Sequence, residues 1–127
     1  LRQVFAINGF SWPHTERLDE RVGRSVQWRI LNLAQETHPM HLHGFYFTVQ
    51  AVGTGMRDTK YQPDDYRTVV TEYMLVGGTM QMTWTPDRSG NWLFHCHLLG
   101  HTSPALRFWK SAPPESHEHA EHEQHDA

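Results

Sequence analysis

Cysteine is nearly absent from this chain, whose 127 residues contain only Cys96. No disulfide can form within the chain, so its cysteine content favours no particular redox compartment. Long apolar runs are absent as well, and the sequence predicts no membrane span. The chain begins at Leu1, with neither an initiator methionine nor a signal-like apolar segment. We therefore expect a processed product or a piece of a longer chain.

A strong excess of one charge is also lacking. The formal net charge is -3, from 11 basic and 14 acidic residues, which argues against a polyanionic partner such as nucleic acid. The charge is uneven, because residues 111–127 contain acids and histidines but no lysine, arginine, aromatic residue or branched apolar residue. Such a composition cannot bury enough apolar surface to fold. We predict one folded domain at 1–110 and a disordered His/Glu-rich tail at 111–127.

Helical periodicity is the third feature that the sequence lacks. Short apolar or alternating segments are instead separated by glycine and proline, which is typical of antiparallel strands and favours an all-β Greek-key sandwich or barrel. The polar stretch 56–66 is predicted to be a long loop. The expected strands are 4–7, 25–33, 45–52, 67–72, 79–85 and 91–97.

Histidine, by contrast, is abundant, and six of the 11 histidines lie in two short motifs. One motif, His95-Cys96-His97 followed by His101, surrounds the single cysteine with histidines. Side chains alternate between the two faces of a strand, so Cys96 points to one face while its two neighbours point to the other. This layout predicts two metal sites back to back. The other motif, HPMHLHG at 38–44, supplies histidines that would complete them.

A thiolate combined with two imidazoles forms a soft trigonal site that suits copper in an electron-transfer role. Cys96, His101 and a histidine from 38–44 match this set, and the five-residue spacing lets the chain turn back onto the same metal. Leu106 follows ten residues after Cys96, where such sites often place a weak axial ligand. Leucine cannot coordinate, so we expect a higher reduction potential than methionine would give there.

The remaining motif histidines form two His-x-His pairs, His41 with His43 and His95 with His97. Facing each other, these pairs would offer four imidazoles on the side away from Cys96. This arrangement predicts a multinuclear metal site, for which a single-copper electron carrier has no need.

Both motifs resemble the copper motifs of the C-terminal cupredoxin domain of laccase-like multicopper oxidases. The resemblance covers most of residues 4–109, including the segments 7–9 and 90–94, and both motifs occur in the expected order and separation. It implies a cupredoxin-like fold. Leu106 takes the axial position as a non-ligand, and Ala105 stands where the family often has glycine.

Carried over position by position, the resemblance also implies the role of each metal ligand. It assigns His38, Cys96 and His101 to a type 1 copper. It assigns His41 to a type 2 copper, and His43, His95 and His97 to a type 3 copper pair.

The implied function is that of a copper-dependent oxidoreductase. A reducing substrate of the phenol or aromatic amine type loses single electrons at the type 1 copper, and dioxygen undergoes four-electron reduction to water at a trinuclear cluster. The resemblance further implies a secreted or periplasmic location. No catalytic residue beyond the metal ligands is expected.

The resemblance also indicates what this chain does not contain. The trinuclear cluster of the family takes its ligands from four His-x-His pairs, of which two usable pairs are present here. We expect an N-terminal cupredoxin domain of the same oxidase, or a second chain, to supply the others. Without that partner, the chain is expected to be inactive as an oxidase.

Two other functions fit parts of the same pattern. A stand-alone blue-copper electron carrier would use only the type 1 site, and a copper-binding or storage module would be favoured if the tail were ordered around metal. Copper stoichiometry separates these functions from an oxidase. His14 is interpreted as an ordinary loop histidine. Met80 and Met82 are interpreted as core residues and Met40 as a packing residue. Six aromatic residues are also interpreted as core: Trp28, Phe45, Phe47, Trp84, Trp92 and Phe94.

Overall fold

The computed structural model describes residues 4–102, so the predicted tail and Leu106 lie outside the described residues. Strands dominate, and the helical elements are the 3-10 helix η1 (Pro63–Asp65) and the short helix α1 (Leu99–Thr102). No helix among the described residues has the length and apolar character needed to cross a membrane. The strands are β1 (Val26–Leu31), β2 (His38–Leu42), β3 (Phe47–Thr54), β4 (Arg57–Lys60), β5 (Arg67–Val69), β6 (Thr71–Met74), β7 (Gly78–Trp84) and β8 (Phe94–Cys96).

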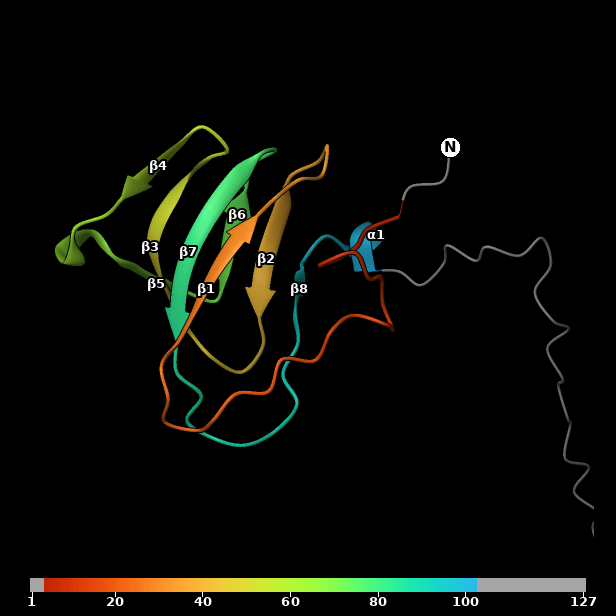
Figure 1. Cartoon of the computed structure of the whole chain (residues 1–127). Helices are drawn as coiled ribbons and strands as arrows, with labels where there is room; N and C mark the ends of the chain where they lie inside the picture. Colours follow the sequence, from red (N-terminus) through yellow and green to blue (C-terminus); the bar gives the residue numbers. More distant parts are fainter. Residues whose placement is uncertain (1–3, 103–127) are drawn as a thin grey trace, which may run out of the picture.

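The strands form two sheets that pack face to face (Figure 1). The larger sheet has the order β1-β7-β3-β4, with β5 also paired to β3, and the smaller sheet has the order β6-β2-β8. Every strand pair is antiparallel. Because the chain passes repeatedly from one sheet to the other, the architecture is an all-β Greek-key sandwich, as the sequence predicts.

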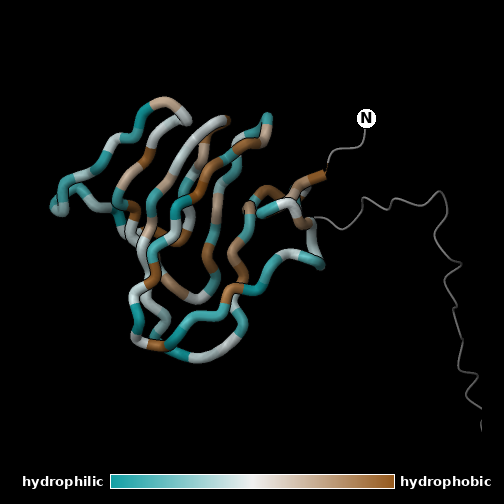
Figure 2. Tube along the Cα trace, in the orientation of Figure 1, coloured by the Kyte–Doolittle hydropathy of each residue, from teal (hydrophilic) through white to brown (hydrophobic). Residues whose placement is uncertain are grey.

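The core lies between the two sheets and is made by alternate residues of their strands. In β7, Met80, Met82 and Trp84 are buried, while the residues between them are half-buried. Hydrophobic and hydrophilic residues accordingly alternate along the strands (Figure 2). Met40 and Leu42 of β2 contribute the same kind of surface from the smaller sheet. Met40, Met80 and Met82 are therefore packing residues, as expected.

Several predicted strand boundaries are wrong. Residues 4–7 form no strand, only a bridge between Ile7 and Phe10 around a tight turn. The predicted loop 56–66 contains β4 and η1, because Arg57–Lys60 finds a partner in β3 despite its polarity. The predicted strand 67–72 is split into β5 and β6, which belong to different sheets.

Gly44, which follows the end of β2, lies against the loop that precedes β8. Its φ is +79°, and a Cβ at this position would lie 2.5 Å from Cε3 of Trp92. Arg88 donates a 2.6 Å hydrogen bond to the Gly44 carbonyl, and its guanidinium lies 4.6 and 4.7 Å from the ring centroids of Phe45 and Trp92. These contacts fix the two motif-bearing segments against each other.

Gly44→Ala should therefore destabilise the fold more than alanine at another glycine with positive φ. We expect a loss of roughly 2–5 kcal/mol, combining left-handed strain with overpacking against Trp92. Gly9→Ala is the matched control, since Gly9 has a φ of +86° but no atom within 4 Å of the added Cβ. It should cost only the strain, about 1–2 kcal/mol. Equal losses in urea unfolding would show that the contact with Trp92 is unimportant.

Candidate metal centre

The register between β2 and β8 determines which motif residues share a face. Met40 pairs with Cys96, and His41 pairs with His95. The hydrogen bond from His97 N to Pro39 O, 2.7 Å long, continues the pairing beyond β8. Since paired residues lie on the same face of a sheet, Cys96 lies on the Met40 side and the histidines on the opposite side.

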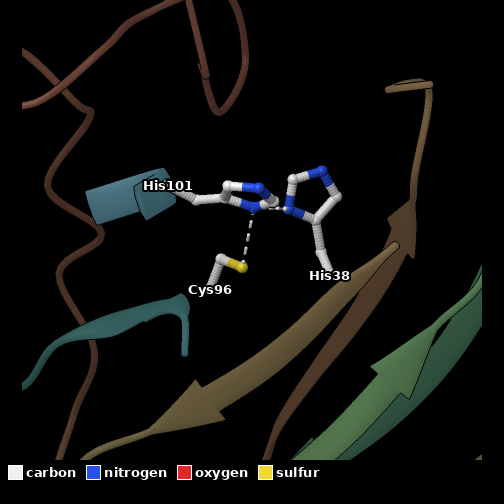
Figure 3. Close-up of side chains that lie close together, drawn as sticks. All are labelled: His38, Cys96 and His101. Carbon is white, nitrogen blue, oxygen red and sulfur yellow. Dashed lines mark hydrogen bonds between the residues drawn. The ribbon is translucent and has the colours of Figure 1, made fainter. Parts of the chain in front are cut away.

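Three side chains meet on the Cys96 side, and we call His38, Cys96 and His101 the thiol–imidazole cluster (Figure 3). His101 Nδ1 lies 3.3 Å from Cys96 Sγ and 3.2 Å from His38 Nδ1. The potential ligand atoms of all three residues lie within 4.8 Å of one another. His38 begins β2, Cys96 ends β8 and His101 comes from α1, so the cluster joins three separate elements.

Burial affects the protonation of this cluster. Burial, and secondarily the nearby His101, lowers the pKa of His38, so its imidazole is neutral at neutral pH and offers a lone pair. Burial raises the pKa of the Cys96 thiol. A metal that binds here must therefore displace the thiol proton.

Metal binding should consequently release about one proton per chain at neutral pH. The test is calorimetric titration with Co²⁺ in two buffers that differ in ionisation enthalpy. We expect heats that differ between the buffers for the wild type and agree for Cys96→Ser. Heats for the wild type that are independent of the buffer would mean that the thiol stays protonated or takes no part.

The opposite side carries His41, His43, His95 and His97, which we call the four-imidazole face. The rings of His41 and His43 are 4.9 Å apart, and those of His41 and His97 are 4.8 Å apart. His43 Nε2 lies 2.9 Å from His95 Nε2. His43 and His97 are exposed, while the other two are half-buried.

Hydrogen bonds orient two of these rings. His95 Nδ1 lies 2.7 Å from the Cys96 carbonyl, which can only accept, so Nδ1 donates and Nε2 carries the lone pair when the ring is neutral. His41 Nδ1 lies 2.8 Å from Thr71 Oγ1. Burial, and then the charges of the neighbouring histidines, lowers the pKa of His41. His41 therefore offers a neutral imidazole to a metal.

The donor atoms of both sites fit copper. One thiol with two imidazoles is the soft set of blue-copper centres, and a purely imidazole face suits the same metal. The seven ligands expected from the sequence are thus divided by the fold into a group of three and a group of four. Sequence reasoning missed Glu36 and Phe5, which contact His101. A carboxylate two residues before a candidate ligand was the available signal, because ligating histidines usually have such a partner.

Comparison with known proteins agrees with this chemistry. Residues 2–110 match the family model described as multicopper oxidase. The chain belongs to the multicopper oxidase family. It is a laccase-like domain of that family, since its relatives include Laccase-10 of Arabidopsis thaliana, 37% identical over 81 residues, and Laccase-10 of Oryza sativa subsp. japonica, 38% identical over 80 residues. These matches cover 60% and 59% of this chain but only 14% of each laccase.

Solved multicopper oxidases share the fold. The enzyme from Campylobacter jejuni, described as a metallo-oxidase, superposes with a TM-score of 0.61 at 23% identity, over 68% of this chain and 18% of that one. The multicopper oxidase from Pseudomonas thermotolerans gives a TM-score of 0.54 at 30% identity, over 64% and 18%. The predicted cupredoxin-like sandwich is confirmed, and copper is the cofactor of the family to which this domain belongs.

Proposed function

We propose that residues 1–110 are the C-terminal cupredoxin domain of a laccase-like oxidase, with one complete type 1 copper site and part of a trinuclear site. His38, Cys96 and His101 would hold the type 1 copper. The observation that carries the proposal is the β2–β8 register, which separates Cys96 from the histidines that flank it.

The four-imidazole face would provide this chain's share of the ligands of the trinuclear site. We assign His41 to the type 2 copper and His43, His95 and His97 to the type 3 pair. Cys96 is covalently continuous with its two histidine neighbours, so ligands of the two sites are adjacent in one chain segment. This short connection through the main chain is what coupling between the two sites requires.

When bound, copper supplies one-electron redox chemistry that couples oxidation of a phenol or aromatic amine to reduction of dioxygen to water. The protein residues supply ligation, spacing and control of the potential. The neutral imidazole of His38 binds without losing a proton, whereas Cys96 must release one. Leu106 is not proposed as a copper ligand, because its side chain has no donor atom.

A partner would complete the trinuclear site. His43 and His97 are exposed in this chain, so a second domain or chain has access to the four-imidazole face. We propose that this partner is an N-terminal cupredoxin domain that carries two further His-x-His pairs, in a secreted or periplasmic oxidase. A stand-alone electron carrier would leave the four-imidazole face without a role.

Dioxygen consumption tests this proposal. The copper-loaded chain alone, mixed with a phenolic reductant, should become reduced without sustained uptake of dioxygen. The complete oxidase that contains the partner domain should sustain it. Continuous reduction of dioxygen to water by the isolated chain would contradict the proposal that the site is shared.

A further inference from the structure

His101 is held by two side chains that lie outside both copper motifs. Its Nε2 lies 2.8 Å from Glu36 Oε2. Its ring stacks on Phe5, with the centroids 4.0 Å apart and the planes inclined by 24°. Its other nitrogen, Nδ1, faces Cys96 and His38, as Figure 3 shows. Nε2 therefore faces a carboxylate, whereas Nδ1 faces the other two proposed copper ligands.

The contact with Glu36 determines where the hydrogen of the neutral ring lies. An ionised carboxylate only accepts hydrogen bonds, so Nε2 must carry the hydrogen and donate it to Glu36. Nδ1 is then the nitrogen with the free lone pair. Because Nδ1 faces Cys96, the carboxylate favours the tautomer of His101 that can bind a metal at this position.

Asn32, a buried polar residue that is 7% exposed, holds the backbone near Glu36. Its Nδ2 donates to the Glu36 carbonyl at 2.8 Å and to the Leu75 carbonyl at 3.0 Å, and its Oδ1 accepts from Ala34 N at 3.0 Å. These bonds tie the loop between β1 and β2 to the turn that follows β6. The Glu36 carboxylate is therefore presented from an anchored loop.

Phe5 restrains the same ring from a different direction. The carboxylate acts in the plane of the imidazole, while Phe5 covers its face. Phe5 is itself fixed where Ser11 Oγ donates a 2.7 Å hydrogen bond to its carbonyl. Since α1 has only four residues, these side-chain contacts contribute much of what orients His101.

We propose that Glu36 is a positioning residue of the type 1 copper site, which fixes His101 with its hydrogen on Nε2 and makes Nδ1 a more basic ligand. This proposal rests on the proposed function, because it takes His101 as a copper ligand. Phe5 holds the plane of the ring, and Asn32 holds the loop that carries the carboxylate.

The negative charge of Glu36 also affects the redox balance. A carboxylate bonded to a ligand imidazole increases electron donation to the metal, which favours Cu²⁺ over Cu⁺. Glu36→Gln keeps the size and one accepting oxygen but removes the charge. Glu36→Ala removes both. The two variants therefore separate the positioning effect from the charge effect.

The first measurement uses the metal-free chain and correlates ring protons with ring nitrogens by NMR. In the wild type we expect the His101 hydrogen on Nε2, observable directly because the bond to Glu36 protects it from exchange with water. The Nε2 proton signal should disappear in Glu36→Ala and persist in Glu16→Gln, whose carboxylate accepts a 3.4 Å hydrogen bond from Asn8 Nδ2. A hydrogen on Nδ1 in the wild type, or an unchanged signal in Glu36→Ala, would overturn the proposal.

The second measurement uses copper alone as the probe. Glu36→Ala should weaken Cu²⁺ binding by roughly 10–100-fold, as for other partners of metal-bound histidines. Glu36→Gln should bind Cu²⁺ more weakly relative to Cu⁺ and so raise the reduction potential, by about 59 mV for each tenfold change in that ratio. Glu16→Gln should change neither value.

The two measurements distinguish failure of this inference from failure of the proposed function. If the wild type binds copper with thiolate absorption, and Glu36→Ala matches it in affinity, absorption and potential, the positioning role is wrong and the copper site stands. If the wild type binds no copper, the proposed function fails. The NMR result then decides alone whether Glu36 selects the tautomer of His101.

Discussion

Replacing Cys96 by serine should abolish the thiolate-to-copper charge-transfer absorption of the copper-loaded chain. The reason is chemical, because Cys96 provides the only thiol in the sequence and a serine hydroxyl cannot supply a soft anionic ligand. Absorption and electron paramagnetic resonance spectra after addition of Cu²⁺ would measure the loss. We expect it to be complete.

The fold should tolerate this change. Serine is close in size to cysteine, and Cys96 is half-buried at the edge of the core, so we expect a loss in stability of about 2 kcal/mol or less. His14→Ala is the control, since this exposed histidine lies outside both motifs. Charge-transfer absorption that survives in Cys96→Ser would show that the thiolate is no ligand.

His97→Ala should stop dioxygen reduction in the complete oxidase without removing the type 1 copper. His97 lies on the four-imidazole face, away from Cys96 Sγ, so the thiol–imidazole cluster stays intact. The turnover of dioxygen should fall by more than roughly 100-fold. Mutating even a hydrogen-bond partner of a metal ligand commonly lowers metal affinity or activity by 10–100-fold. The blue absorption should remain.

The control for His97→Ala is again His14→Ala, which should leave both turnover and absorption unchanged. Two results would contradict our assignment. Turnover near the wild-type level would remove His97 from the trinuclear site. Loss of the blue absorption together with turnover would mean that the two faces of β8 do not act as separate sites.

The division of the ligands between two faces was predictable from the sequence, because it depends only on alternation in a strand. Cys96 and its flanking histidines must diverge in any extended segment. The position of His101 was harder to predict, since it depends on a four-residue helix that the spacing of the motif allows but does not require. The structure brings it within 3.3 Å of Cys96 Sγ.

The residues that support the ligands were not predictable in the same way. Phe5 was expected in a strand, but residues 4–7 have no strand partner, and its ring lies against His101 instead. A strand was expected at 25–33, yet β1 ends at Leu31 and Leu33 is 84% exposed. The bonds of Asn32 to the turn after β6 redirect the chain there. Such long-range contacts leave no periodic signal in a sequence.

β4 is the opposite case, in which a strand forms where the sequence predicted a loop. Arg57–Lys60 has no apolar alternation, and its residues are exposed throughout. It forms a strand because β3 offers an unpaired edge, to which the backbone alone can bond. The pairing partner, and not the local sequence, decides the structure of this segment.

The copper content of the isolated chain tests our central claim most directly. Metal analysis combined with quantitative electron paramagnetic resonance should find one tightly bound copper in the isolated chain, with a type 1 signal that depends on Cys96. The complete oxidase should contain type 2 and type 3 copper as well, which a stand-alone electron carrier would lack. A full complement of type 1, type 2 and type 3 copper in the isolated chain would contradict the claim that the trinuclear site is shared with a partner. Copper bound without any type 1 signal would contradict the claim that the thiol–imidazole cluster is complete.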